Sequence, residues 1–340
     1  MSKPQREVLK ATEVQVNNDI SRGVKMLLKL EQKGYKPFQY PWAFEAWKTQ
    51  QKMHWLPEEV QLNEDVIDYK ERLTDDERAV VTDVLRFFTQ GDVDVGNCYI
   101  DKYLTMFKPV EVRMMLTAFS NMETIHMQAY SHLLDTLGLP ESDYNKFMDI
   151  DCMRKKHEND IKIHDATELL QALAIYGGFV EGLQLFGSFA ILMNFQRFGL
   201  LKGVGQIVTW SVRDETLHSE SIIKLFHELA KESDINIRFL EVVIKRKAQL
   251  ALSLEKDFLM YIFRDGRKVR GIDFNSIYNY LKHLYHMRMD MLGFKRDEKV
   301  ENGMCLQYMQ DLLHSVEFAN FFTSKSTEYT RANLTGEWEY

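Results

Sequence analysis

The chain has 340 residues, of which 45% are hydrophobic and 27% are charged, and its formal net charge is −7. This composition excludes wholesale disorder and allows one large domain with a sizeable core. The acidic balance argues against nucleic-acid binding, which normally requires a basic face.

Cysteine usage and apolar runs narrow the class of protein further. The three cysteines, Cys98, Cys152 and Cys305, lie far apart and form no CxxC pair. A disulfide framework or a zinc-thiolate site is therefore not expected, and a reducing cytoplasm fits. Residues 1–10 are polar, unlike a signal peptide. Apolar stretches such as Phe186–Phe195 are too short to span a bilayer, so we expect a cytoplasmic protein without membrane contact.

All six prolines occur at or before Pro140, so the following 200 residues can form long helices without interruption. We predict an irregular N-terminal arm over residues 1–45, with one short helix at 19–33. A helical domain is expected at 46–322, and a polar, flexible tail at 323–340. No segment has a strand-like pattern, which indicates an all-α fold. The helices expected in the domain cover about 42–53, 77–103, 109–138, 143–158, 165–198, 203–231, 234–264, 272–292 and 302–322.

One apolar face of the helix expected at 109–138 carries a carboxylate and an imidazole. The residues on this face recur at steps of four, three and four: Phe119, Glu123, His126 and Tyr130. This spacing places them on one stripe that points into the core. A single Glu-x-x-His pair is common on solvated helix surfaces, so by itself it does not indicate a metal site.

The helix expected at 203–231 repeats the pattern with Glu215 and His218, and Ile222 and Leu225 continue its apolar stripe. Burying an unpaired carboxylate costs several kcal/mol. Several such acids in one core would need cations, and two divalent metal ions would supply the missing charge. Two Glu-x-x-His helices plus one acid from each of two others is the ligand pattern of carboxylate-bridged dimetal bundles.

Two further acids lie in apolar surroundings and complete this pattern. Glu181 lies in the most apolar expected helix, where Gly177 and Gly182 would let a neighbouring helix approach closely. Asp92 lies within the segment 87–95, again in apolar surroundings. Each of these acids alone could equally serve as a hydrogen-bonding residue between helices. Together the pattern predicts a helical bundle that binds two transition-metal ions. The predicted ligands are Asp92, Glu123, His126, Glu181, Glu215 and His218.

At these motifs the sequence resembles the small, radical-generating subunit of class I ribonucleotide reductase, over nearly the whole chain from about Trp55 onward. Asp92 lies 31 residues before Glu123, and Glu181 lies 34 residues before Glu215, as the family pattern requires. The resemblance implies a ferritin-like bundle with extra helices and a homodimer. It also implies a dimetal centre whose one-electron oxidant passes to a large catalytic subunit, where ribonucleoside diphosphates become deoxyribonucleotides.

The resemblance also assigns roles along a radical path. Trp55 matches the family's surface-side tryptophan, and Asp214 matches the carboxylate that links this tryptophan to a metal-bound histidine, here His126. Tyr130 matches the tyrosine that holds the radical. Tryptophan and tyrosine are oxidisable, and a buried aspartate can accept the indole proton, so the residue types suit the implied roles.

The tail carries the last part of the implied path. Tyr329 is the favoured relay to the large subunit, with Tyr340 as the weaker alternative. The end of the chain, with Trp338, resembles the segment that docks into the large subunit.

One departure bears on the cofactor. The family's tyrosine usually sits among three apolar residues, whereas the matching positions here are Leu185, Phe189 and Ser211. The Ser211 hydroxyl puts a long-lived radical on Tyr130 in doubt. Two irons are the favoured metals, and two manganese ions or one of each, storing the oxidising equivalent themselves, are the alternatives. The need for an activating flavoprotein stays open.

Two other functions compete with this interpretation. A different ferritin-like dimetal oxidase or hydroxylase would share the six ligands, but it would have no use for Trp55, Asp214 and a tyrosine tail together. An iron-storage or purely structural helical protein would not need them either, and storage would require a cage that nothing in the sequence suggests.

Overall fold

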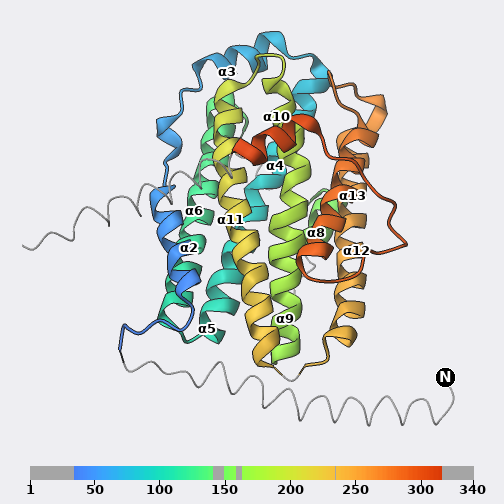
Figure 1. Cartoon of the computed structure of the whole chain (residues 1–340). Coiled ribbons are helices and arrows are strands. Elements are labelled where there is room, and N and C mark those ends of the chain that lie inside the picture. Colours follow the sequence, from blue (N-terminus) through green and yellow to red (C-terminus); the bar gives the residue numbers. More distant parts are fainter. Residues whose placement is uncertain (1–33, 141–148, 158–162, 234, 316–340) are drawn as a thin grey trace, which may run out of the picture.

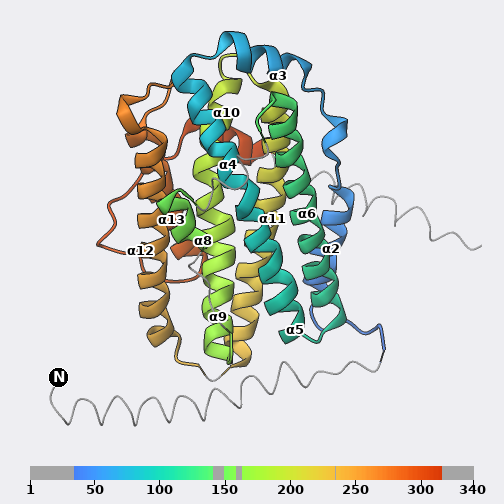
Figure 2. The ribbon, with the colours of Figure 1, turned by 180° about the vertical axis from the view of Figure 1, so that it is seen from behind.

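The computed structural model describes residues 34–140, 149–157, 163–233 and 235–315. Within these ranges the regular structure is helical, apart from one isolated β-bridge between Val269 and Ile272. The long helices lie side by side along a common axis (Figure 1), and the view from behind shows the same bundle (Figure 2). The predicted all-α bundle is confirmed.

The bundle consists of long helices, several of which continue through turns of π-helix. In chain order its longer elements are α2 (Pro41–Lys52), α4 (Asp75–Asn97), η3 (Cys98–Tyr103), α6 (Val110–Leu137), α9 (Ala166–Ile175), η4 (Tyr176–Gln184), α10 (Leu185–Gln196), α11 (Lys202–Glu232), α12 (Ile237–Ile262) and α13 (Phe274–Met291). Shorter pieces connect them: η1 (Pro57–Glu59), α3 (Asn63–Ile67), η2 (Asp68–Arg72), α5 (Leu104–Met106), α8 (Asp151–His157) and η5 (Arg264–Gly266).

The expected helices at 42–53, 109–138, 203–231 and 272–292 correspond to α2, α6, α11 and α13, with ends that differ by at most two residues. The helix expected at 234–264 is α12. Those at 143–158 and 302–322 fall only partly within the described residues, which show α8 and a helix at 307–315. The short helix expected at 19–33 lies outside the described residues, as do most of the N-terminal arm and all of the tail.

Local capping explains where two of the long helices begin. The Thr74 hydroxyl accepts a hydrogen bond from the backbone N–H of Glu77, and the Glu77 carboxylate accepts one from the backbone N–H of Thr74. Asp273 and Ser276 form the same reciprocal pair at the start of α13. Such boxes satisfy N–H groups that the helix itself leaves unpaired.

The helix expected at 165–198 is interrupted by the π-helical segment η4, which the sequence pattern did not predict. Rare π-turns inside long helices frequently mark functional sites, and η4 carries Glu181. Close packing requires glycine here, because a Cβ on Gly177 would lie 2.5 Å from the Cγ2 atom of Ile222 on α11. Segment 166–196 is long and apolar enough to cross a membrane, but 94% of its most apolar window is buried within the bundle, as expected of a core helix.

Candidate metal centre

The six predicted ligands come from four segments that meet in the interior of the bundle. Asp92 lies on α4, Glu123 and His126 on α6, Glu181 on η4, and Glu215 and His218 on α11. Each has at most 1% of its surface exposed. Four of them place one ligand atom each within 4.8 Å of the others: Glu123, Glu181, Glu215 and His218.

The two histidines tie the two Glu-x-x-His helices together. His126 Nδ1 lies 3.2 Å from Glu215 Oε1 on the other helix and 3.6 Å from Glu123 Oε2 on its own. His218 Nδ1 lies 3.0 Å from Glu123 Oε1 and 3.9 Å from Glu215 Oε2. Each imidazole therefore directs its Nδ1 atom to the space between the same two carboxylates.

Asp92 is not among the four closest ligand groups, but it lies near enough to interact with them electrostatically. Burial raises the pKa of Asp92 well above its usual value; His126 opposes this shift and the charge of Glu123 adds to it. Asp92 therefore interacts electrostatically with His126 and Glu123 of the cluster.

The cluster holds four buried carboxylates and two imidazoles, so the histidines cannot balance all of its acids. Among the described residues, both oxygens of Glu123, both oxygens of Glu215, and one oxygen each of Asp92 and Glu181 accept no hydrogen bond. Burial, and then the neighbouring acids, raise the pKa of Glu181 well above its usual value and that of Glu215 to about 7. Buried polar atoms are rarely left unpaired in proteins. Divalent cations fit this arrangement, and mixed oxygen and imidazole donors suit iron or manganese.

Hydrogen bonds behind the histidines orient them for this role. His126 Nε2 lies 3.2 Å from Asp214 Oδ2, and the Gln50 amide bridges the other histidine to the same aspartate. Gln50 Nε2 donates to Asp214 Oδ1 at 3.0 Å, so its Oε1 atom accepts from His218 Nε2 at 3.1 Å. A histidine that donates through Nε2 keeps a lone pair on Nδ1, the atom that faces the cluster.

Gln50 is a functional residue that the sequence analysis missed. It is only 1% exposed, although it lies on the largely polar helix α2. The sequence around Gln50 did not indicate this role, because its two partners, Asp214 and His218, lie 164 and 168 residues later in the chain.

Trp55 joins the same network. Its indole Nε1 donates to Asp214 Oδ2 at 2.8 Å, and its ring centroid lies 5.9 Å from that of His126 and 5.1 Å from that of Trp210. The residue is 2% exposed in the isolated chain. The structure therefore brings the three residues of the expected path, Trp55, Asp214 and His126, into a continuous line of contacts.

Tyr130 is buried near the cluster, with 1% of its surface exposed. Its ring stacks on Phe88 with centroids 4.2 Å apart and an angle of 10° between the planes. Its hydroxyl donates to Ser211 Oγ at 3.0 Å, and Ser211 in turn donates to the backbone carbonyl of Ile207. Burial, together with the charge of Asp92, raises the pKa of the Tyr130 phenol well above its usual value, so it is neutral.

The structure places Ser211 against Tyr130, as the motif match suggested, and adds Phe88, which the sequence analysis missed. Phe189 lies behind Phe88, with ring centroids 5.3 Å apart. The tail residues Tyr329, Trp338 and Tyr340 lie outside the described residues.

The chain is similar in sequence to one family over most of its length. The family model described as "Ribonucleotide reductase, small chain" matches residues 32–297. A probable ribonucleoside-diphosphate reductase small subunit from Invertebrate iridescent virus 3 is 36% identical over 328 residues, which cover 90% of this chain and 86% of the relative. The corresponding protein of Invertebrate iridescent virus 6 is 34% identical, with 89% and 95% covered.

Solved structures of low sequence identity share the fold. The ribonucleotide reductase R2 subunit from Clostridium botulinum superposes with a TM-score of 0.71 at 21% identity, covering 83% of this chain and 91% of that one. A dimanganese(II) NrdF from Streptococcus sanguinis gives a TM-score of 0.67 at 17% identity, covering 78% and 92%.

Proposed function

Since this chain belongs to the ribonucleotide reductase small-chain family and is a small subunit of ribonucleoside-diphosphate reductase, we propose that its six clustered acids and imidazoles bind two transition-metal ions. The observation that carries this proposal is the set of buried carboxylate oxygens without hydrogen-bond partners among the described residues. When bound, such a metal pair supplies one-electron redox chemistry that side chains lack.

The proposed ligands are Asp92, Glu123, His126, Glu181, Glu215 and His218. Gln50 and Asp214 hold the two imidazoles with their Nδ1 atoms toward the metal ions. Two irons are the favoured pair. Two manganese ions, as the Streptococcus sanguinis protein is described to hold, or one ion of each are the alternatives.

Tyr130 is the favoured site of the stored radical, and the metal pair is the alternative because Ser211 places a hydroxyl beside the ring. Its phenol is shielded from water, which protects an oxidised ring from side reactions. The phenolic proton must leave when the ring loses an electron. Ser211 accepts the hydrogen bond but is too weak a base to keep a proton, so the proton must reach a carboxylate. Asp92 is the acid whose charge acts most strongly on Tyr130.

Trp55 and Asp214 form the proposed exit path for the oxidising equivalent. When Trp55 loses an electron, its indole proton can move to Asp214 across the existing 2.8 Å hydrogen bond. The contact between Asp214 and His126 continues the path to the metal ligands.

A small subunit of this family works with a large catalytic subunit. Tyr329 in the tail is the proposed relay between the two, with Tyr340 as the alternative, and residues 323–340 are the proposed docking segment. We further propose a cytoplasmic homodimer with separate regions at 1–45, 46–322 and 323–340. An activating flavoprotein is the additional partner to test.

Paired substitutions test the two aromatic roles. In assays with the large subunit, Tyr130→Phe and Trp55→Phe should each abolish nucleotide reduction while the metal content stays unchanged. Trp47→Phe is the matched control, because Trp47 stacks on Phe44 at the surface of α2 and contacts none of the proposed ligands. Electron paramagnetic resonance should show a tyrosyl signal in the Trp47→Phe protein that Tyr130→Phe lacks. Full activity of Tyr130→Phe would place the oxidising equivalent on the metals instead.

A truncation tests the tail. Deletion of residues 325–340 should block turnover with the large subunit and leave metal binding intact. Unchanged nucleotide reduction by the truncated chain would refute the proposed role of Tyr329.

A further inference from the structure

A pocket of about 260 Å³ lies between the first turns of α4 and the segment that follows α12, away from the metal ligands. Four arginines line it: Arg78, Arg86, Arg264 and Arg267. One of its two acids, Asp83, lies nine residues before Asp92 on α4. At 1.5 Å per residue this is about 13 Å along the helix. The arginine pocket, named here for these four residues, is therefore separate from the candidate metal centre.

Three of the four arginines in the arginine pocket share one carboxylate. Asp83 is 1% exposed and accepts ion pairs from three guanidinium groups, those of Arg86 at 2.7 Å, Arg264 at 2.8 Å and Arg267 at 2.7 Å. Arg78 pairs with the exposed Asp75 at 2.9 Å. Arg264 and Arg267 thus share their carboxylate partner with Arg86, in a chain whose net charge is −7. Like charges held this close repel one another, and a bound anion would relieve that repulsion.

Two of the arginines also have unused donors. The hydrogen bonds of Arg264 and Arg267 run through Nη1, to Asp83 and to the backbone carbonyls of Tyr261 and Ile262. Among the described residues, their Nε and Nη2 groups meet no protein acceptor. Arg78 differs, because its Nε, Nη1 and Nη2 groups all donate to protein oxygens.

The geometry of these two side chains suits a phosphate group. A guanidinium offers five N–H donors in a rigid, planar fork that matches phosphate oxygens. The Arg264 guanidinium lies 3.7 Å from the ring centroid of Tyr261, a contact that holds the side chain in place. The first turn of α4 adds the partial positive charge of a helix N-terminus, while the Asp75 carboxylate at that end opposes it.

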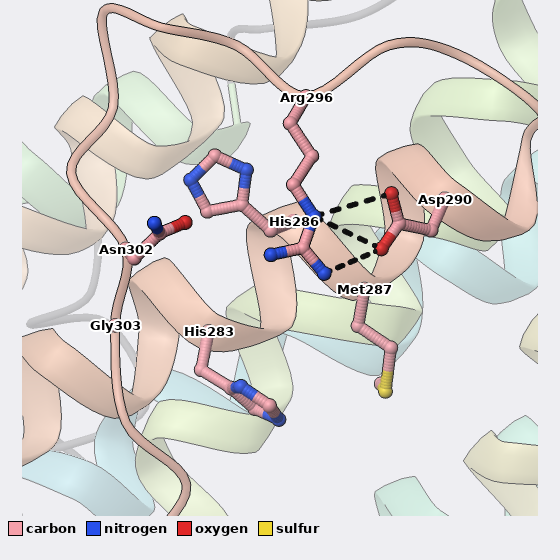
Figure 3. Close-up of a pocket in the computed structure, with 7 residues that line it drawn as sticks. All are labelled: His283, His286, Met287, Asp290, Arg296, Asn302 and Gly303. Atoms are coloured by element: carbon pink, nitrogen blue, oxygen red, sulfur yellow. Dashed lines mark hydrogen bonds and ion pairs between the residues drawn. The ribbon is translucent and has the colours of Figure 1, made fainter.

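A smaller pocket on α13, of about 150 Å³, shows the contrasting case. Its arginine, Arg296, pairs with the Asp290 carboxylate through both Nε and Nη2, with the closest contact at 2.8 Å (Figure 3). Burial, with Arg296 and His286 nearby, lowers the pKa of His283, so this histidine is neutral at pH 7. This pocket has no excess of positive charge to attract an anion.

We propose that the arginine pocket binds the phosphate groups of a small phosphorylated ligand, either inorganic diphosphate or the two phosphates of a nucleoside diphosphate, through Arg264 and Arg267. The pocket is smaller than the roughly 300–1,000 Å³ of sites that enclose drug-sized ligands. It therefore suits a diphosphate rather than an enclosed base and sugar. This binding does not depend on the metal centre.

Isothermal titration calorimetry on the metal-loaded full chain, at constant ionic strength, tests this proposal. Diphosphate should bind with one site per chain, and sulfate should bind more weakly. Arg264→Gln and Arg267→Gln should each raise the dissociation constant about tenfold or more, because each removes charge-assisted hydrogen bonds. Arg113→Gln, which removes an exposed positive charge on α6, is the matched control and should bind diphosphate like the unaltered chain. Metal content measured before and after titration excludes chelation as the source of heat.

Two results would overturn the proposal: no binding of diphosphate at millimolar concentration, or equal binding by the unaltered chain and both glutamine variants. Circular dichroism should show unchanged helicity in the variants, because Asp83 keeps two arginine partners in each. Arg264→Lys, which keeps the charge but loses the fork, should bind more weakly than the unaltered chain and more tightly than Arg264→Gln. ADP identifies the source of the phosphates: affinity equal to that of diphosphate indicates the phosphates alone, and higher affinity indicates a nucleotide.

Discussion

Helix α4 carries three buried acids whose surroundings differ along its length. Near its start, the Glu77 carboxylate accepts two hydrogen bonds from the Arg270 guanidinium, at 2.6 and 2.7 Å. Six residues later, Asp83 is held by three arginines. Nine residues further on, Asp92 has one oxygen without a hydrogen-bond partner among the described residues, and the charges that act most strongly on it are those of His126 and Glu123.

The difference shows how buried acids with structural roles can be told from those that bind cations. Glu77 and Asp83 tie α4 to the segment after α12 and need nothing beyond the protein to balance their charge. Asp92 and the acids around it have only two imidazoles for four carboxylates. Burial of uncompensated charge is costly, which is why we propose that the acids of the cluster bind metal ions.

The largest effect is expected when an acid of the cluster is removed. Glu215→Ala should lower both bound metal and nucleotide reduction by more than about a hundredfold, since changes even behind the ligands of metal sites cost 10–100-fold. Metal analysis and an activity assay with the large subunit measure this. Glu228→Ala, at the surface of the same helix, is the control. Retention of two metals per chain by Glu215→Ala would remove Glu215 from the ligand set.

Removal of the structural acid Asp83 should act on stability instead. Asp83→Asn leaves three guanidinium groups without their carboxylate. Breaking a buried ion pair costs about 3–5 kcal/mol, and the partial exposure of Arg264 reduces this to about 2–3 kcal/mol. Urea unfolding measures the change, and metal content should not vary. A loss below about 0.5 kcal/mol would mean that the arginines do not depend on Asp83.

The pairing of Glu77 should appear as a pH dependence of stability. Burial alone would raise the pKa of Glu77, but hydrogen bonds from Arg270 and Thr74 outweigh it and hold the pKa at about 2. The pKa of Glu77 is lower in the folded chain than in the unfolded chain, where it is near 4.5. The ionised carboxylate therefore stabilises the folded protein at pH values above 4.5. This stabilisation is lost as the pH falls through about 2. Between pH 5 and pH 2, the free energy of unfolding should fall in both proteins, but by about 1–2 kcal/mol less in Glu77→Gln than in the unaltered chain. Equal slopes for both proteins would contradict the pairing.

The smallest expected effect has the opposite sign: replacing an acid of the cluster should stabilise the metal-free protein, whereas replacing Asp83 should destabilise it. In metal-free protein, Glu181→Gln should raise the free energy of unfolding by about 1 kcal/mol. The buried Glu181 carboxyl must either stay charged without compensation or take up a proton, and a glutamine of nearly the same shape avoids both costs. Differential scanning calorimetry with a chelator measures this. Destabilisation of the metal-free chain by Glu181→Gln would show that Glu181 is already balanced by the protein.

The helical periodicity of the sequence was sufficient to predict the helices. It also placed Glu123 with His126, and Glu215 with His218, on one apolar face of each helix. It succeeded because residues three and four positions apart share a helix face whatever the neighbouring helices do. It could not predict the π-helical turns of η4, because their different hydrogen bonding leaves no clear mark in residue spacing.

Other parts of the site depend on contacts between segments far apart in the chain. Gln50 and Phe88 act through partners that only the packing of helices brings near. In the arginine pocket, Asp83 pairs with Arg267, which lies 184 residues later in the chain. The sequence around either residue therefore gives no indication of a site.

Anomalous X-ray scattering at the iron and manganese edges, from crystals of protein produced with both metals, most directly tests whether the unpaired acids bind metal ions. We expect two peaks per chain, both within coordination distance of the carboxylates of Glu123 and Glu215. The absence of peaks among these side chains, or a single peak elsewhere in the molecule, would contradict the proposed centre.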